Sequence, residues 1–113
     1  LLAKAVANDS TCLDAFTTLK MATLNAAQAL GLADSIGSLK KGKQADIVAI
    51  NFDQLETTPL YEPVSQLIYS GNRQQVTDVW IAGKQVLNKR QLTTLEYKRL
   101  LETARRWEEK IKS

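Results

Sequence analysis

The feature that most constrains this chain is a stretch of helical sequence, residues 11–30, that is apolar around almost its whole circumference. Thr11 and Asp14 form a T-x-x-D pattern that predicts a helix start. Gly31 supplies the left-handed residue that commonly closes a helix. The larger apolar positions are Leu13, Phe16, Leu19, Leu24, Ala27 and Leu30, and Ala22, Ala26 and Ala29 occupy the other sides. We expect such a helix to need neighbours on more than one side.

The length and composition fit one small soluble domain. The chain has 113 residues, of which 44% are hydrophobic and 24% charged; these values exclude disordered and collagen-like classes and predict a modest core. No apolar run approaches the roughly 20 residues of a membrane span, and residues 1–7 lack the features of a leader. We expect a soluble, cytoplasmic chain with no membrane partner. It begins with Leu rather than Met, which leaves open that it is a fragment.

The reactive residue types restrict the chemistry. The chain contains no histidine, so it cannot hold a Ser-His-Asp or Cys-His site. Its single cysteine, Cys12, cannot form an internal disulfide, which fits a reducing compartment. Cys12 is then the only soft metal ligand in the chain, which argues against a zinc site. A nucleophilic role for Cys12 is disfavoured.

The carboxylates form no close pair in apolar sequence of the kind that tunes one acid against another. Asp46 stands out because it lies at the start of a predicted strand. Binding of nearby backbone amides, as Asp does in turns, is favoured over a catalytic role. Trp80 and Trp107 are interpreted as core or interface anchors rather than as platforms for ligand stacking.

The positive charge is concentrated towards the end of the chain. From Lys89 onward there are eight Lys or Arg against four Glu, a net charge of +4. The whole chain has a net charge of +3, so the residues before Lys89 sum to −1. Such asymmetry can indicate a nucleic-acid partner. Here the signs interleave as on a solvated helix face, which disfavours nucleic-acid binding.

A glycine and lysine turn, "GSLKKGK" at residues 37–43, has the glycine spacing of a phosphate-binding loop. Such a loop needs Ser or Thr after its lysine and lies between a strand and a following helix. Gln44 follows Lys43, and the predicted order is helix, then turn, then strand. The turn is therefore interpreted as the entry to a sheet, with its lysines facing solvent.

The remaining elements follow from local patterns. A strand is predicted over residues 45–50, and a hairpin over 76–81 and 84–87 with Ala82-Gly83 as its turn. Pro63 suits the first turn of a short helix reaching Tyr69. Thr93 and Glu96 form a T-x-x-E capping box that opens a final helix. The apolar stripe of that helix comprises Tyr97, Leu100, Leu101, Ala104, Trp107 and Ile111.

Four blocks in this order resemble the C-terminal end of the amidohydrolase superfamily: "MATLNAAQALGL", "SIGSLKKGKQADIVAINF", "TPLYEPVSQLIYS" and "VTDVWIAGKQVL". The third block is similar to the branch of 5-methylthioadenosine/S-adenosylhomocysteine deaminases and related chlorohydrolases. The resemblance implies an α+β C-terminal fragment of a (β/α)8-barrel enzyme. Residues 1–33 would end the barrel, 34–92 would be the C-terminal part of a composite β-sandwich with an inserted short helical segment, and 93–113 would be the C-terminal helix.

The chemistry that the resemblance implies is attack of a metal-activated hydroxide on an aromatic carbon. The family's ligands, an H-x-H motif, further histidines and an aspartate, have no counterpart in this chain. We therefore expect no catalytic, cofactor-binding or metal-binding residue here, and zinc or iron only in a full-length parent.

The parent is expected to deaminate an adenine-type nucleoside thioether, and this chain alone to be inactive. The alternatives are a chlorohydrolase or other aminohydrolase as parent, or a non-catalytic binding or assembly module. The expected partner is the missing N-terminal part of the parent, or a second copy joined through exposed strand edges.

Overall fold

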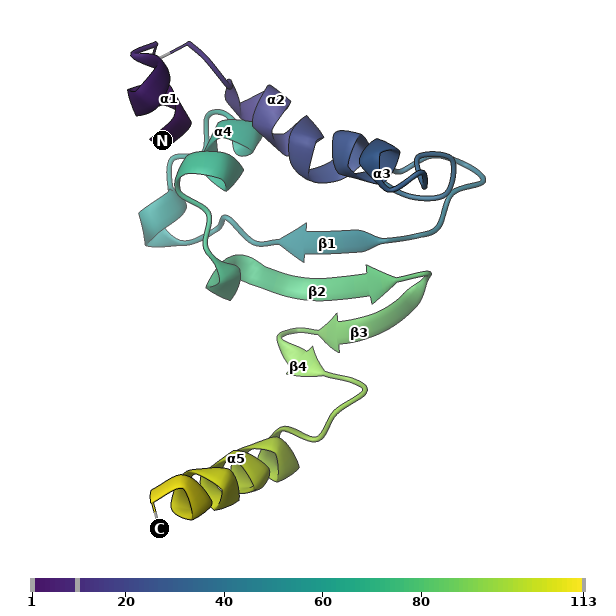
Figure 1. The fold of residues 1–113 in the computed structure, drawn as a ribbon, viewed down its shortest axis with the longest axis vertical. Coiled ribbons are helices and arrows are strands. Elements are labelled where there is room, and N and C mark those ends of the chain that lie inside the picture. Colours follow the sequence, from purple (N-terminus) through teal and green to yellow (C-terminus); the bar gives the residue numbers. More distant parts are fainter. Residues whose placement is uncertain (1, 10, 113) are drawn as a thin grey trace.

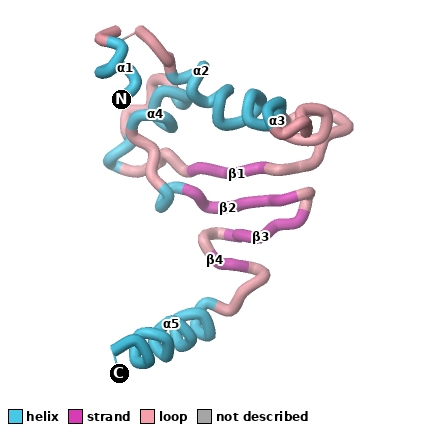
Figure 2. The backbone as a smooth tube through the Cα atoms, viewed as in Figure 1, coloured by secondary structure: helices cyan, strands magenta, loops and turns pink. Residues whose placement is uncertain are grey.

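The computed structural model describes residues 2–9 and 11–112 as a helical segment followed by an antiparallel sheet and a separate last helix (Figures 1 and 2). The sheet has four strands in the order β1-β2-β3-β4, so each strand pairs with the next one along the chain. The helices are α1 (Leu2–Ala7), α2 (Ala15–Lys20), α3 (Ala26–Ala29), α4 (Pro63–Tyr69) and α5 (Tyr97–Lys112). The strands are β1 (Ile47–Ile50), β2 (Val76–Ile81), β3 (Lys84–Asn88) and β4 (Gln91–Leu92). The combination of helices and an antiparallel sheet confirms the α+β class.

The long apolar helix is present, but it begins later than predicted. The carboxylate of Asp14 caps α2 by accepting the Thr17 N–H at 2.9 Å, whereas Thr11 donates its N–H and its hydroxyl to Asp9 at 2.8 and 2.6 Å. Leu13 has a φ of 52°, which prevents the helix from extending back to Thr11. A π-helical turn, Met21–Asn25, joins α2 to α3, and Gly31 follows with the predicted left-handed φ of 70°.

The predicted hairpin is present, and a further strand follows it. Ala82 and Gly83 both have positive φ, 49° and 78°, as a two-residue type I′ turn requires. A similar turn at Lys89 and Arg90, with φ of 45° and 65°, leads into β4, which sequence patterns did not predict. Lys and Arg are unusual in such a turn. This turn is held by β2, because the Arg90 N–H donates to the Thr77 carbonyl at 2.8 Å. The first strand begins at Ile47 rather than at residue 45.

One face of the sheet carries a continuous row of aliphatic side chains. Val48 lies opposite Val79, Val79 opposite Leu87, and Leu87 opposite Leu92. Residues directly opposite one another across antiparallel strands point to the same face. We call these four residues the sheet row.

The capping box predicted for the last helix is wrong. Thr93 belongs to the sheet region: its N–H donates to the Val86 carbonyl at 3.1 Å and its hydroxyl to the Gln85 carbonyl at 2.6 Å. The hydroxyl is therefore committed to β3, and α5 begins at Tyr97. The predicted α4 is present over Pro63–Tyr69, with Pro63 in its first turn.

The chain has almost no core of its own, so the expectation of a modest core is wrong. Among the described residues only Ala15 and Ala27 are buried hydrophobic residues. The accessible surface is 9338 Å², about 3,000 Å² more than a compact protein of this mass exposes. The radius of gyration is 18.3 Å, against about 13 Å for a compact domain of this length.

Candidate functional site

The residue types that carry hydrolytic chemistry do not converge. Within the described residues there is no group of three or more His, Cys, Asp or Glu that could hold a metal ion. The chain also has no histidine to supply the usual nitrogen ligand. Its residues therefore do not fit a zinc or iron site. No helix in the described part of the chain is long and apolar enough to cross a membrane.

The glycine and lysine turn is packed against α3 rather than open to an anion. The Lys43 ammonium donates to the carbonyls of Ala33 and Ile36, the latter at 3.1 Å. Gly37 has a φ of 85°, and a Cβ at this position would lie 2.6 Å from the Cβ of Ala27. The Lys43 charge is thus directed at carbonyls of the segment just before the turn. The expectation of solvent-facing lysines holds for the exposed Lys40 and Lys41 and is wrong for the half-buried Lys43.

Asp46 binds a backbone amide, as predicted, but the donor is distant in sequence. Its carboxylate accepts the Ala82 N–H at 2.7 Å, so it joins the start of β1 to the β2–β3 turn. This contact explains why an aspartate precedes the strand, because its carboxylate provides a charged hydrogen-bond acceptor for the N–H of a turn residue. The geometry gives Asp46 a structural role.

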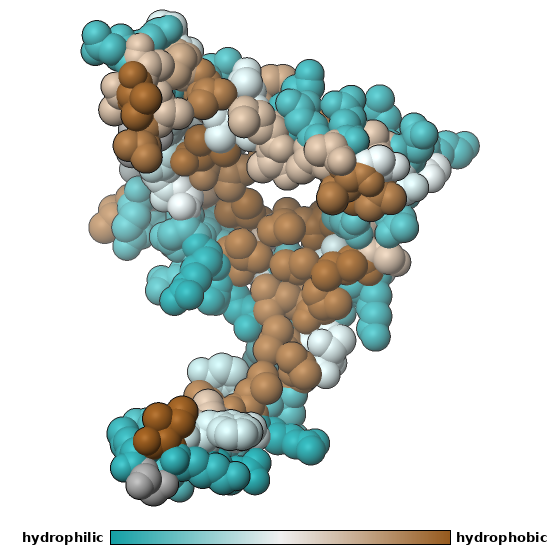
Figure 3. Space-filling model, viewed as in Figure 1, coloured by the Kyte–Doolittle hydropathy of each residue, from teal (hydrophilic) through white to brown (hydrophobic). Residues whose placement is uncertain are grey.

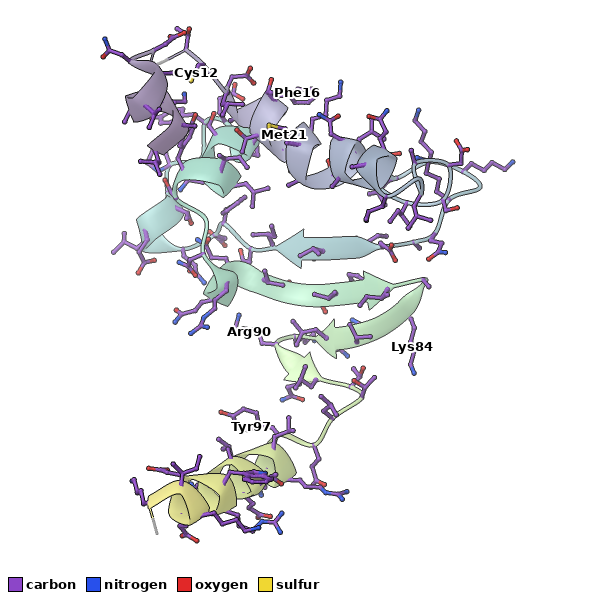
Figure 4. The ribbon with its side chains drawn as sticks, viewed as in Figure 1. Cys12, Phe16, Met21, Lys84, Arg90 and Tyr97 are labelled. Carbon is purple, nitrogen blue, oxygen red and sulfur yellow. The ribbon has the colours of Figure 1, made fainter. Side chains whose placement is uncertain are left out.

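The other candidate residues are also separated from one another. The half-buried Cys12 donates its thiol to the Ala3 carbonyl at 3.8 Å. Trp80 is half-buried in β2 opposite Ile47. Trp107 on α5 is 61% exposed, with the Lys110 ammonium 5.1 Å from its ring centre. Figure 4 places Cys12 near α1 and Tyr97 at the start of the distant α5.

Several residues that organise the fold carried no sequence signal. Arg90 is the clearest, because its guanidinium donates to the carbonyls of Arg73, Gln74 and Val76. Gln75 is the most buried side chain in the described part of the chain; it accepts the Asn72 N–H at 2.9 Å and so completes a cap. An exposed arginine or a buried glutamine is recognised only when the distant carbonyls and amides that it meets are known.

The most prominent candidate functional feature is an extended exposed apolar surface. Figure 3 shows hydrophobic side chains gathered over the strands of the sheet. In the sheet row, Val48 is 54% and Leu92 43% exposed. Large apolar side chains are also exposed on the helical side and on α5: Phe16, Met21, Leu30, Leu39, Leu55, Tyr61, Tyr97, Trp107 and Ile111. Apolar side chains gathered in this way over the sheet are typical of a face that packs on another protein body.

Comparison with known proteins relates this chain to one part of longer proteins. Residues 1–86 match the model of the Amidohydrolase family. The chain is 45% identical, over 98% of its length, to the 5-methylthioadenosine/S-adenosylhomocysteine deaminase of Teredinibacter turnerae, of which it covers 25%. It is 42% identical over its whole length to the enzyme of that name from Saccharophagus degradans, again covering 25%. The chain therefore spans about a quarter of the length of these curated relatives.

Solved structures also match this chain over only a part of their own length. A zinc-bound adenosine deaminase from Xanthomonas campestris matches 98% of this chain with 55% identity and a TM-score of 0.92, and the match covers 25% of that protein. The atrazine chlorohydrolase of Arthrobacter aurescens, also complexed with zinc, matches 80% of this chain with 26% identity and a TM-score of 0.73; this match covers 20% of that protein.

Proposed function

Because this chain belongs to the amidohydrolase family, we propose that it is the C-terminal part of a metal-dependent hydrolase that deaminates an adenine-type nucleoside thioether. The substrate would be S-adenosylhomocysteine or methylthioadenosine. One observation carries the proposal: the chain is 45% identical, along 98% of its length, to a 5-methylthioadenosine/S-adenosylhomocysteine deaminase. In this proposal residues 1–33 end the barrel, 34–92 contribute to the composite sandwich, and 93–113 form the terminal helix.

The role of this part would be structural support of a site that lies elsewhere. Its residues do not fit a metal site, so the metal ion and the groups that move protons would come from the rest of the enzyme. The exposed apolar surface supports this division, because packing on the barrel would bury it. Burial of apolar surface contributes about 25 cal/mol per Å², so covering these exposed side chains would favour attachment of this part to the rest of the enzyme.

The proposal is tested by producing the full reading frame and measuring ammonia release from S-adenosylhomocysteine, methylthioadenosine and adenosine. Chloride release from atrazine is measured in parallel, because the 26% identity to an atrazine chlorohydrolase makes that reaction the second candidate. We expect ammonia from the thioether nucleosides and no chloride. Chloride release without ammonia would reassign the parent to the chlorohydrolase branch.

The chain produced alone provides the matched control. We expect it to show neither turnover nor stoichiometric zinc or iron by elemental analysis. Turnover by this chain with a bound metal would overturn the division of roles. A coding sequence that begins at Leu1 would instead favour a non-catalytic assembly module.

A further inference from the structure

We draw no further inference here: the strongest candidate, the cavity beside α1 and α4 lined by Lys4, Thr18 and Tyr69, presents only half-buried or exposed polar side chains, and nothing in the structure shows what occupies it.

Discussion

Gly37 is the residue at which conformation and packing most clearly require glycine. Its φ of 85° is one that side-chain-bearing residues rarely adopt, and a Cβ would come within 2.6 Å of the Ala27 Cβ and 3.1 Å of the Thr23 carbonyl oxygen. Gly42 has a similar φ of 92° but open space around it. Substitutions at these two glycines therefore distinguish the loss of stability caused by backbone strain from the loss caused by steric overlap.

We predict that Gly37→Ala destabilises the protein by about 2 to 4 kcal/mol, and Gly42→Ala by only about 1 to 2 kcal/mol. Both substitutions place an alanine in the left-handed region, but only the first also pushes the turn away from α3. Denaturant unfolding of the two variants measures the difference. Equal losses would show that the turn yields easily and that close packing at Gly37 is unimportant.

Asp14 makes the start of α2 sensitive to acid. The Thr17 N–H, and then the Thr17 hydroxyl, hold the pKa of this carboxyl below its ordinary value of 3.8. Since the folded-state pKa is the lower one, the cap adds stability above the ordinary pKa. That stability is lost as the pH falls through the folded-state value.

We predict that Asp14→Asn reduces the loss of unfolding free energy between about pH 5 and about pH 3. The amide oxygen still caps the helix but has no proton to gain. Denaturant titrations across this range provide the measurement, and Asp34→Asn, at an exposed loop residue, is the control. Identical acid dependence in the wild type and Asp14→Asn would contradict the role assigned to the cap.

Among the elements, the β3–β4 turn is joined to the start of β2 by the Arg90 side chain. The Arg90 guanidinium donates to the carbonyls of Arg73, Gln74 and Val76, the last at 3.0 Å. It thereby joins this turn to the segment that leads into β2. A planar guanidinium can reach several carbonyls at once, which a lysine ammonium does less well.

We predict that Arg90→Ala costs about 1 to 2 kcal/mol of unfolding free energy, and that Arg90→Lys recovers only part of it. Arg73→Ala is the matched control, because Arg73 contributes only its backbone carbonyl to this contact. Thermal unfolding of the three variants is sufficient. A loss at Arg73 as large as that at Arg90 would indicate a general effect of surface charge.

The elements differ in how far sequence alone predicts them. The β2–β3 hairpin, α4 and the end of the long helix at Gly31 follow from local residues, and all three are present. Thr93 was misassigned to a helix cap because its hydroxyl finds a carbonyl of β3, a partner that no local pattern contains. The turn at Lys89 and Arg90 has no local signal for the same reason: its left-handed residues are held not by glycine or asparagine but by β2, where the Thr77 carbonyl accepts the Arg90 N–H and the Asp78 carboxylate accepts the Lys89 N–H.

At the scale of the whole molecule, amino-acid composition gave a misleading expectation of a core. A hydrophobic content of 44% predicts buried side chains, yet here most of those side chains face outward. The apolar circumference of residues 11–30 was the better guide, because it required neighbours on several sides. The candidate site, an exposed apolar surface rather than a pocket, is visible only when the exposure of each side chain is known.

We predict that the chain produced alone associates into dimers or larger assemblies, because the sheet row and the outer edge of β1 lack partners among the described residues. Leu92→Lys should reduce this association, since it places a charge in the sheet row. Gln91→Lys, one residue away on the other face of β4, should not. Sedimentation over a range of concentrations tests this, and a stable wild-type monomer at high concentration would contradict it.

The strand order has a consequence for how the protein reaches its folded state. Two-residue turns join β2 to β3 and β3 to β4, so these three strands have a low contact order, whereas β1 pairs with β2 across the intervening residues 51–75. Sheets of this kind form faster than those that join distant segments. We therefore expect β2, β3 and β4 to pair early in refolding, before β1 and the rest of the protein pack against them.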